Sequence, residues 1–196
     1  MKQVITTIVV AVATGILREK LTVPFRFVHL QMQPADTTLL MPVEGISVLR
    51  VADTWSVPRP GSRRHQGQDI FAPKGTPVLS ATRGIVVRIG TNSLGGKIVS
   101  VAGSGGRMYY YAHLDSYAED LSVGDDVRPG SLIGYVGNTG NARNTPPHLH
   151  FGVYMAAGAI NPLPILVDGE LNGSKKLGHD AAGSTARRLH RTPSRS

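Results

Sequence analysis

Two histidines, His148 and His150, stand in a segment over residues 146–154 that reads Pro-Pro-His-Leu-His-Phe-Gly-Val-Tyr. From Leu149 onward the segment is rich in aromatic and β-branched residues, which predicts a strand. Residues two apart on a strand point to the same face, so both imidazoles lie on one side, about 6.6 Å apart at a rise of about 3.3 Å per residue. One histidine can then bind a metal while the other transfers protons; the alternative is a pair of solvated histidines.

Three further residues of the kind that bind metals precede this segment. His65 and Asp69 stand in the run His-Gln-Gly-Gln-Asp, and His113 ends the run Tyr-Tyr-Tyr-Ala-His. Gly67 and the prolines that follow argue against a helix, so residues 65–69 are expected to be bent or extended, and on a strand His65 and Asp69 share a face. The chain has no cysteine, so a metal site must use histidine and carboxylate.

Two histidines and one carboxylate match the ligand set of many catalytic zinc sites, in which the fourth position is left for water. Such a site keeps one positive charge, which lowers the pKa of the bound water, polarises a carbonyl and suits amide hydrolysis. A remaining histidine can take the proton of the water and pass it to the leaving amine, while a second holds the oxyanion. These residues alone leave open which of the five candidates does what: His65, Asp69, His113, His148 and His150.

Three motifs, in this order, resemble the lysostaphin-type (LytM-like) zinc peptidases that cut peptidoglycan cross-bridges. They are His-Gln-Gly-Gln-Asp-Ile from His65, Tyr-Tyr-Ala-His-Leu around His113, and His-Leu-His-Phe-Gly-Val-Tyr from His148. The likeness runs from about Gly45 to Leu166, and the connecting Val-Gly-Asp-x-Val stretch also falls in register.

The resemblance implies a Zn²⁺ cofactor with His65, Asp69 and His150 as ligands, and His113 and His148 as the catalytic pair. It implies a compact antiparallel β fold, sandwich-like or barrel-like, with the metal in a groove on one sheet. It also implies a metalloendopeptidase that hydrolyses the peptide cross-links of peptidoglycan.

One stretch departs from the family pattern. Many members place a Tyr or a Phe-Gly pair shortly before the first histidine, where it helps to hold the transition state. This chain instead has Val-Pro-Arg-Pro-Gly-Ser-Arg-Arg over residues 57–64. Either an arginine takes that role or the role is absent.

The elements that must position these residues are expected to be short strands, which makes the fold class all-β. Among 196 residues, 23 glycines and 13 prolines break the middle of the chain into short apolar runs. Turns are expected at residues 91–92 and 103–106. Extended runs are expected at residues 47–51, 78–81, 84–89, 97–101, 107–113, 121–130 and 131–137.

The chain length suits one domain with extensions. We expect a signal peptide or membrane anchor over residues 1–20, a connector over 21–44, the zinc peptidase domain over 45–167 and a basic disordered tail over 168–196. The first of these holds an uncharged, mostly apolar run over residues 3–17 after one lysine, which suits the core of a secretion signal or an uncleaved anchor. We therefore expect export to the periplasm or cell envelope, with inner-membrane attachment as one alternative.

The end of the chain is basic. Residues 171–196 hold six Lys or Arg against the single acid Asp180, so they carry +5 of the net charge of +8. This charge favours anionic polymers or lipid head groups. No aromatic residue interleaves the charges and no binding motif is present, so no specific nucleic-acid partner is expected.

Three other functions share some of these sequence features. A catalytically inactive module of the same fold that activates another cell-wall hydrolase is the main alternative, although such modules are expected to lack one or more of the five site residues. A biotinyl or lipoyl carrier needs a lysine at a tight turn between apolar residues, and none stands there. A phosphocarrier with two facing histidines leaves Asp69 without a role.

Overall fold

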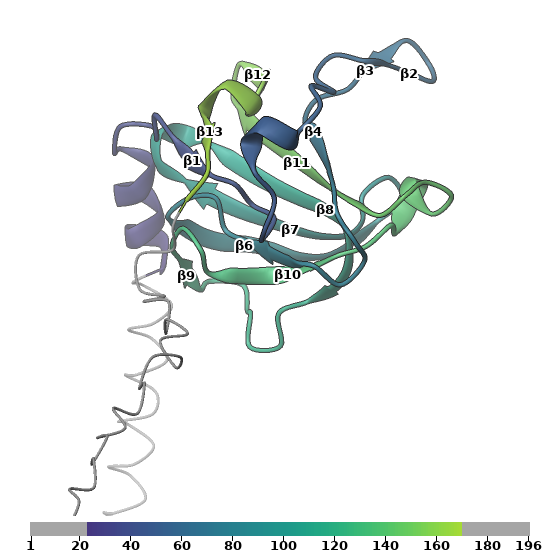
Figure 1. Cartoon of the computed structure of the whole chain (residues 1–196). Helices are drawn as coiled ribbons and strands as arrows, with labels where there is room; N and C mark the ends of the chain where they lie inside the picture. The colour runs from purple at the N-terminus through teal and green to yellow at the C-terminus, as the bar shows by residue number, and fades with distance from the viewer. Residues whose placement is uncertain (1–22, 170–196) are drawn as a thin grey trace, which may run out of the picture.

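A branched antiparallel sheet forms the body of the domain in the computed structural model, which describes residues 23–169 (Figure 1). Strands β12, β11, β8, β7, β6 and β9 lie side by side in that order, while β4 pairs with β11, and β10 pairs with both β8 and β5. The nine strands are β4 (Gln68–Phe71), β5 (Pro77–Leu79), β6 (Gly84–Asn92), β7 (Gly96–Gly103), β8 (Met108–Tyr117), β9 (Asp126–Val127), β10 (Leu132–Val136), β11 (His148–Met155) and β12 (Gly158–Ile160). The all-β antiparallel class is confirmed, and within the described range the sheet does not close into a barrel.

Two pairs of short strands complete the fold. Strand β1 (Leu39–Leu40) runs parallel to β13 (Leu166–Val167), and β2 (Pro58–Arg59) forms a hairpin with β3 (Arg63–Arg64). In Figure 1 this hairpin projects beyond β4. Four 3-10 turns lie between strands: η1 (Val48–Arg50), η2 (Ser104–Gly106), η3 (Gly140–Ala142) and η4 (Leu163–Ile165).

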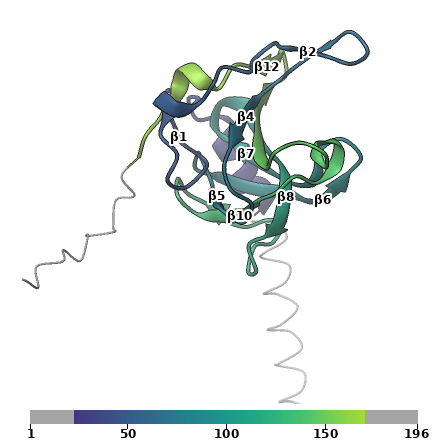
Figure 2. The same ribbon diagram turned by 45° about the vertical axis from the view of Figure 1, so that its right-hand side comes forward.

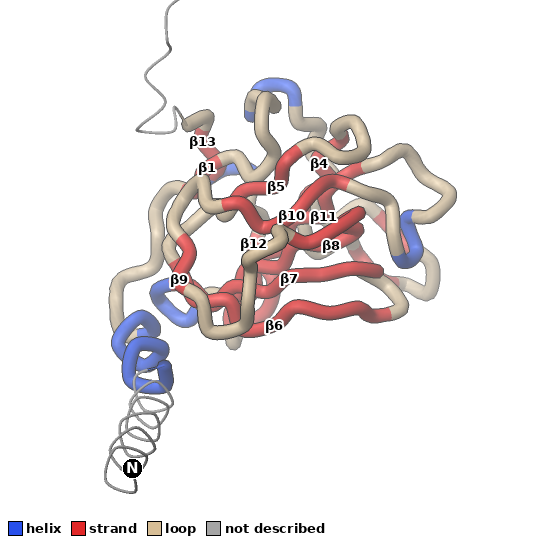
Figure 3. Tube along the Cα trace, turned by 90° about the horizontal axis from the view of Figure 1, so that it is seen from below, coloured by secondary structure: helices blue, strands red, loops and turns tan. Residues whose placement is uncertain are grey.

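The segment expected to be a connector contributes to the packed domain. Leu39, Met41 and Val43 are buried in the core, so packing begins before Gly45. A helix over residues 23–31 lies against the sheet near β9, where Arg26 forms an ion pair with Asp126 (Figure 3). No helix within residues 23–169 is both long enough and apolar enough to cross a membrane. The expected leader and nearly all of the expected basic tail lie outside the described residues.

Alternation along the central strands separates the core from the site. In β11, Leu149, Phe151 and Val153 are fully buried in the hydrophobic core. The residues that alternate with them, His148, His150 and Gly152, point to the opposite face because side chains alternate along a strand. Tyr109 and Tyr111 of β8 pack their rings against Phe151, with centroids 6.4 and 5.2 Å from it. The core thus fixes the strands whose other face carries the histidines.

Two local expectations are wrong. Residues 47–51 form the 3-10 turn η1 and not an extended run, because the carboxylate of Asp168 accepts hydrogen bonds from the Ser47 hydroxyl and the Val48 amide. The turn expected at residues 91–92 lies at residues 93–95, since β6 continues through Asn92, which pairs with Gly96. The side chain of Asn92 then accepts a hydrogen bond from the amide of Gly95 and closes that turn.

Candidate metal centre

The pairing of β11 with its two neighbours, β4 and β8, brings the candidate residues together. Figure 2 labels these two neighbouring strands in a second view. His150 stands directly opposite Asp69 of β4 on one side and opposite Ala112 of β8 on the other. His148 lies two residues before His150 on the same face, and His113 follows Ala112. His65 precedes β4, in the link that follows the β2–β3 hairpin. All five residues singled out in the sequence therefore meet on one face of the sheet.

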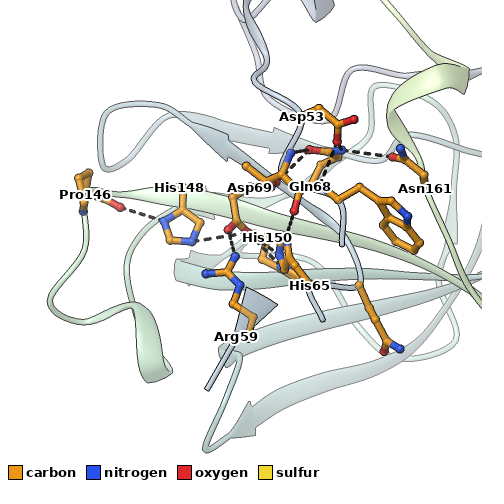
Figure 4. Close-up of polar contacts among 12 residues, drawn as sticks. Asp53, Arg59, His65, Gln68, Asp69, Pro146, His148, His150 and Asn161 are labelled. Carbon is orange, nitrogen blue, oxygen red and sulfur yellow. Dashed lines mark hydrogen bonds and ion pairs between the residues drawn. The ribbon is translucent and has the colours of Figure 1, made fainter. Parts of the chain in front are cut away.

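Three of them converge on one point. Nε2 of His65 lies 2.8 Å from Nδ1 of His150, and Oδ1 of Asp69 lies 3.0 Å from each of these nitrogens (Figure 4). Within residues 23–169, this trio also forms a group of side chains suited to holding a metal ion. His65 and Asp69 are buried, and the side chain of His150 is 14% exposed.

A backbone carbonyl orients His65. Its Nδ1 lies 2.6 Å from the carbonyl oxygen of Thr54, which is only an acceptor, so Nδ1 carries the proton and Nε2 keeps a lone pair. That lone pair faces an oxygen of Asp69 and a nitrogen of His150. Three electron-rich atoms at such distances repel one another unless a proton or a cation lies among them. The donor set fits zinc, which takes histidine nitrogen and carboxylate oxygen.

The charge states of the trio support the same fit. Burial opposes ionisation of Asp69, but the hydrogen bonds that His150 and His65 donate when their rings are protonated, together with the positive charge of those rings, hold its pKa far below the ordinary value. Burial lowers the pKa of His150, against the opposing influence of Asp69. Asp69 is therefore ionised at pH 7, and a carboxylate must be ionised to bind a metal.

Gln68 and Thr54 support the trio and were not predicted as site residues. The amide and the hydroxyl of Thr54 both donate to Oε1 of Gln68 at 2.9 Å, and the amide of Asp69 donates to the Thr54 hydroxyl. Gln68 is fully buried and donates through Nε2 to Asp53 and Asn161. The only sequence signal was the place of Gln68 inside the His-Gln-Gly-Gln-Asp motif.

Close packing explains the glycine of that motif. A Cβ atom at Gly67 would lie 2.7 Å from Cε1 of His150 and 2.8 Å from both its Nε2 and the carbonyl oxygen of Phe151. Real Cβ atoms do not approach backbone and ring atoms so closely, so any side chain at residue 67 must displace His150.

His113 has a backbone conformation that the sequence does not suggest. Its φ is 63°, in the left-handed region that is costly for residues other than glycine and is over-represented at functional sites. The register between β7 and β8 shifts here, since Lys97 pairs with Leu114 but Val99 pairs with Tyr111. The extra residue is a β-bulge, a feature that redirects a side chain. His113 was expected in a regular strand, and the bulge turns it toward the site.

His113 and His148 share one hydrogen-bonding arrangement. Nδ1 of His113 donates to the carbonyl oxygen of Thr139, and Nδ1 of His148 donates to that of Pro146, both at 2.9 Å. Each therefore keeps Nε2 unprotonated when neutral. The two rings meet edge to face with centroids 5.0 Å apart, and Nε2 of His148 lies 3.8 Å from Oδ1 of Asp69. Neither ring is as close to the point of convergence as the trio itself.

The surroundings of His113 keep it neutral. Burial, followed by repulsion from His148 and His150, lowers its pKa to about 4. At pH 7 its ring is therefore uncharged and able to accept a proton.

One arginine of the stretch that departs from the family pattern reaches this site. Nη2 of Arg59, in β2, lies 2.5 Å from Oδ2 of Asp69, the carboxylate oxygen that does not face His65 and His150.

Comparisons with known proteins agree with the site. The chain is 38% identical over 115 residues to an L-Ala–D-Glu endopeptidase of Bacillus subtilis, a match that covers 54% of this chain and 35% of that protein. It is 36% identical over 108 residues to the glycyl-glycine endopeptidase ALE-1 of Staphylococcus capitis, covering 52% of this chain and 29% of that protein. The match thus spans about a third of the length of these curated relatives.

A solved structure shows the same fold. The catalytic domain of lysostaphin from Staphylococcus simulans superposes with a TM-score of 0.53 at 30% identity, covering 60% of this chain and 92% of that domain. The sequence pattern of peptidase family M23 matches residues 63–162, a span that holds all five site residues. The chain belongs to peptidase family M23.

Proposed function

We propose that the chain is a zinc metalloendopeptidase that hydrolyses peptide cross-links of peptidoglycan. The observation that carries the proposal is the convergence of His65, Asp69 and His150 with two further histidines on the same face. The family and the relative named for an L-Ala–D-Glu bond support the substrate class. A D-amino acid is foreign to ribosomally made proteins, so a bond next to D-Glu indicates a cell-wall peptide.

His65, Asp69 and His150 would hold the zinc, which when bound would polarise the scissile carbonyl and acidify a water molecule. The chain's own groups handle the protons. Neutral His113 accepts a proton from the attacking water through its free Nε2 and returns it to the leaving amine. His148 presents its Nε2 on the same side. When the ring of His148 is protonated, this Nε2–H donates a hydrogen bond to the developing oxyanion.

The test is digestion of isolated peptidoglycan by the purified zinc-loaded chain, with the released fragments identified by mass spectrometry. A new free amine at one defined peptide bond is the expected result, and the fragments identify the bond. Zinc-loaded protein that binds peptidoglycan but releases nothing would overturn the proposal. It would favour the alternative, an inactive binding module that activates another cell-wall hydrolase.

We also propose that the chain acts outside the cytoplasm, in the periplasm or cell envelope, and that its N-terminus attaches it to the inner membrane. Support comes from the apolar run over residues 3–17 and from the +5 charge of residues 171–196, which suits the anionic wall. Cell fractionation tests the location. Removal of residues 171–196 should weaken wall binding at low salt and change little at 1 M salt, where the Debye length is about 3 Å. Full-length protein in the cytoplasm would contradict the proposed location.

A further inference from the structure

The ion pair between Arg59 and Asp69 places a partly exposed guanidinium group beside the proposed metal ligands. The side chain of Asp69 is 8% exposed, whereas that of Arg59 is 41% exposed. Figure 4 shows the contact between the two side chains. The arginine thus reaches inward with one nitrogen and presents the rest of its head group to solvent. It contacts the carboxylate on the side away from His65 and His150.

The hairpin holds Arg59 in this position. The strands pair Arg59 with Arg63, so Pro60, Gly61 and Ser62 form a three-residue loop at the tip, in which Gly61 and Ser62 have φ values of 76° and 60°. The other two arginines bond to carbonyl groups of their own segment: Arg63 to Pro60 and Arg64 to Ser56. Of the three hairpin arginines, Arg59 is the one with a described contact to the site.

The chemistry of this position favours an anion. A guanidinium has five N–H donors in a planar fork that matches a carboxylate, and the contact with Asp69 uses one nitrogen. A divalent ion and Asp69 together keep one positive charge, and Arg59 adds a second. The nearby carboxylate of Asp53 is already bonded to Gln68 and to the amide of Trp55. Asp53 is ionised, because these hydrogen bonds lower its pKa, and it reduces the sum by one. With a divalent ion bound, these groups would therefore keep a net positive charge.

We infer that Arg59 determines specificity by binding a carboxylate of the substrate beside the scissile bond. The inference rests on the proposed function. It assigns the chain to substrates such as stem peptides, which carry carboxylates, and not to bridges made of glycine, whose residues have no side-chain charge. The carboxylate belongs either to an internal acidic residue or to the end of the peptide chain, and both would meet the same fork.

The experiment compares matched peptides. An acidic stem peptide is prepared with its internal carboxylate free or amidated, and separately with its terminal carboxylate free or amidated, beside a neutral oligoglycine. Each is made as a cleavable substrate and as an analogue that lacks the scissile amide. Turnover is measured for the first set, and the dissociation constant by calorimetry for the second, with the zinc content of every protein determined beforehand.

For the wild-type protein, amidation of one of the two carboxylates should weaken analogue binding on the order of 10-fold to 100-fold, the scale of a hydrogen bond between charged groups. The amidation that weakens binding identifies which of the two carboxylates Arg59 binds. Arg59→Gln should bind the acid and the amide equally. Arg59→Lys, which keeps the charge without the fork, should retain part of the preference. Arg63→Gln is the matched control on the same hairpin and should behave as wild type.

Equal binding of acid and amide by the wild type, or a preference that survives in Arg59→Gln, would overturn the inference and leave the proposed function standing. A preference that depends on Arg59 without any turnover would support the inference and contradict the proposed catalysis. If Arg59→Gln fails to hold zinc, the wild-type comparison and Arg59→Lys decide the matter.

Discussion

Nε2 of His65 lies 2.8 Å from Nδ1 of His150, although 85 residues separate them in the chain. The two residues use different ring nitrogens, and His65 is fixed because its other nitrogen donates to the carbonyl of Thr54. With an oxygen of Asp69 at 3.0 Å from both, the arrangement brings three electron-rich atoms to one point. The proposed zinc site depends on that convergence.

His113 and His148 are expected to act on protons and not to hold the metal. His113→Asn and His148→Gln should each keep zinc and lose on the order of 10²-fold or more in turnover, the usual scale for acid–base groups. Asparagine is chosen at residue 113 because it tolerates the positive φ there. Exposed His29→Gln is the control and should keep full activity. Loss of zinc from both site variants would instead identify them as ligands.

The buried His113 should make the metal-free protein sensitive to acid. Its pKa is about 4 in the folded state against 6.5 as the ordinary value, so between these pH values the unfolded chain binds a proton that the folded chain does not. The free energy of unfolding should therefore fall as pH drops from about 6.5 to about 4, with a contribution from His113 on the order of 2 kcal/mol. Urea unfolding of wild type and His113→Asn across this range checks it. Parallel curves for the two proteins would refute the contribution of His113.

The close approach of Gly67 to His150 predicts a large effect from one methyl group. Gly67→Ala should weaken zinc affinity by tenfold or more, because the added Cβ displaces the ring of a ligand. Gly90→Ala is a matched control, since a Cβ at that position meets nothing within 4 Å. Competition with a chelator of known affinity measures both. Equal affinities in the two variants would mean that the ring of His150 is free to move.

Gln68 should stabilise both the fold and the site. Gln68→Leu leaves the amide and hydroxyl of Thr54 without their acceptor and should cost about 1–3 kcal/mol, the penalty for an unpaired buried polar group. Thr54 then holds His65 less firmly, so zinc affinity should fall as well. Thermal unfolding with and without zinc separates the two effects. A variant as stable as wild type, with unchanged affinity, would show that the network has no positioning role.

Features of the site that depend on neighbouring residues could be predicted from the sequence. Features that depend on residues far apart in the chain could not. The alternation of β11 placed His148 and His150 on one face, and the structure has them there. The left-handed conformation of His113 was missed because Tyr-Tyr-Ala-His reads as a regular strand, and its bulge arises from pairing with β7. Thr54 was missed because its hydrogen bonds join residues that meet only after folding. The turn at η1 likewise depends on Asp168, 120 residues away.

The metal content of purified protein, measured together with turnover, is the direct test of zinc-dependent cleavage. Wild-type protein should contain one zinc ion per chain, lose both zinc and peptidoglycan cleavage on dialysis against a chelator, and regain both with one equivalent of zinc. Asp69→Ala should show reduced occupancy and no turnover, because it removes the carboxylate that both His65 and His150 face. Full zinc content in Asp69→Ala, or cleavage by the zinc-free wild-type protein, would contradict the account.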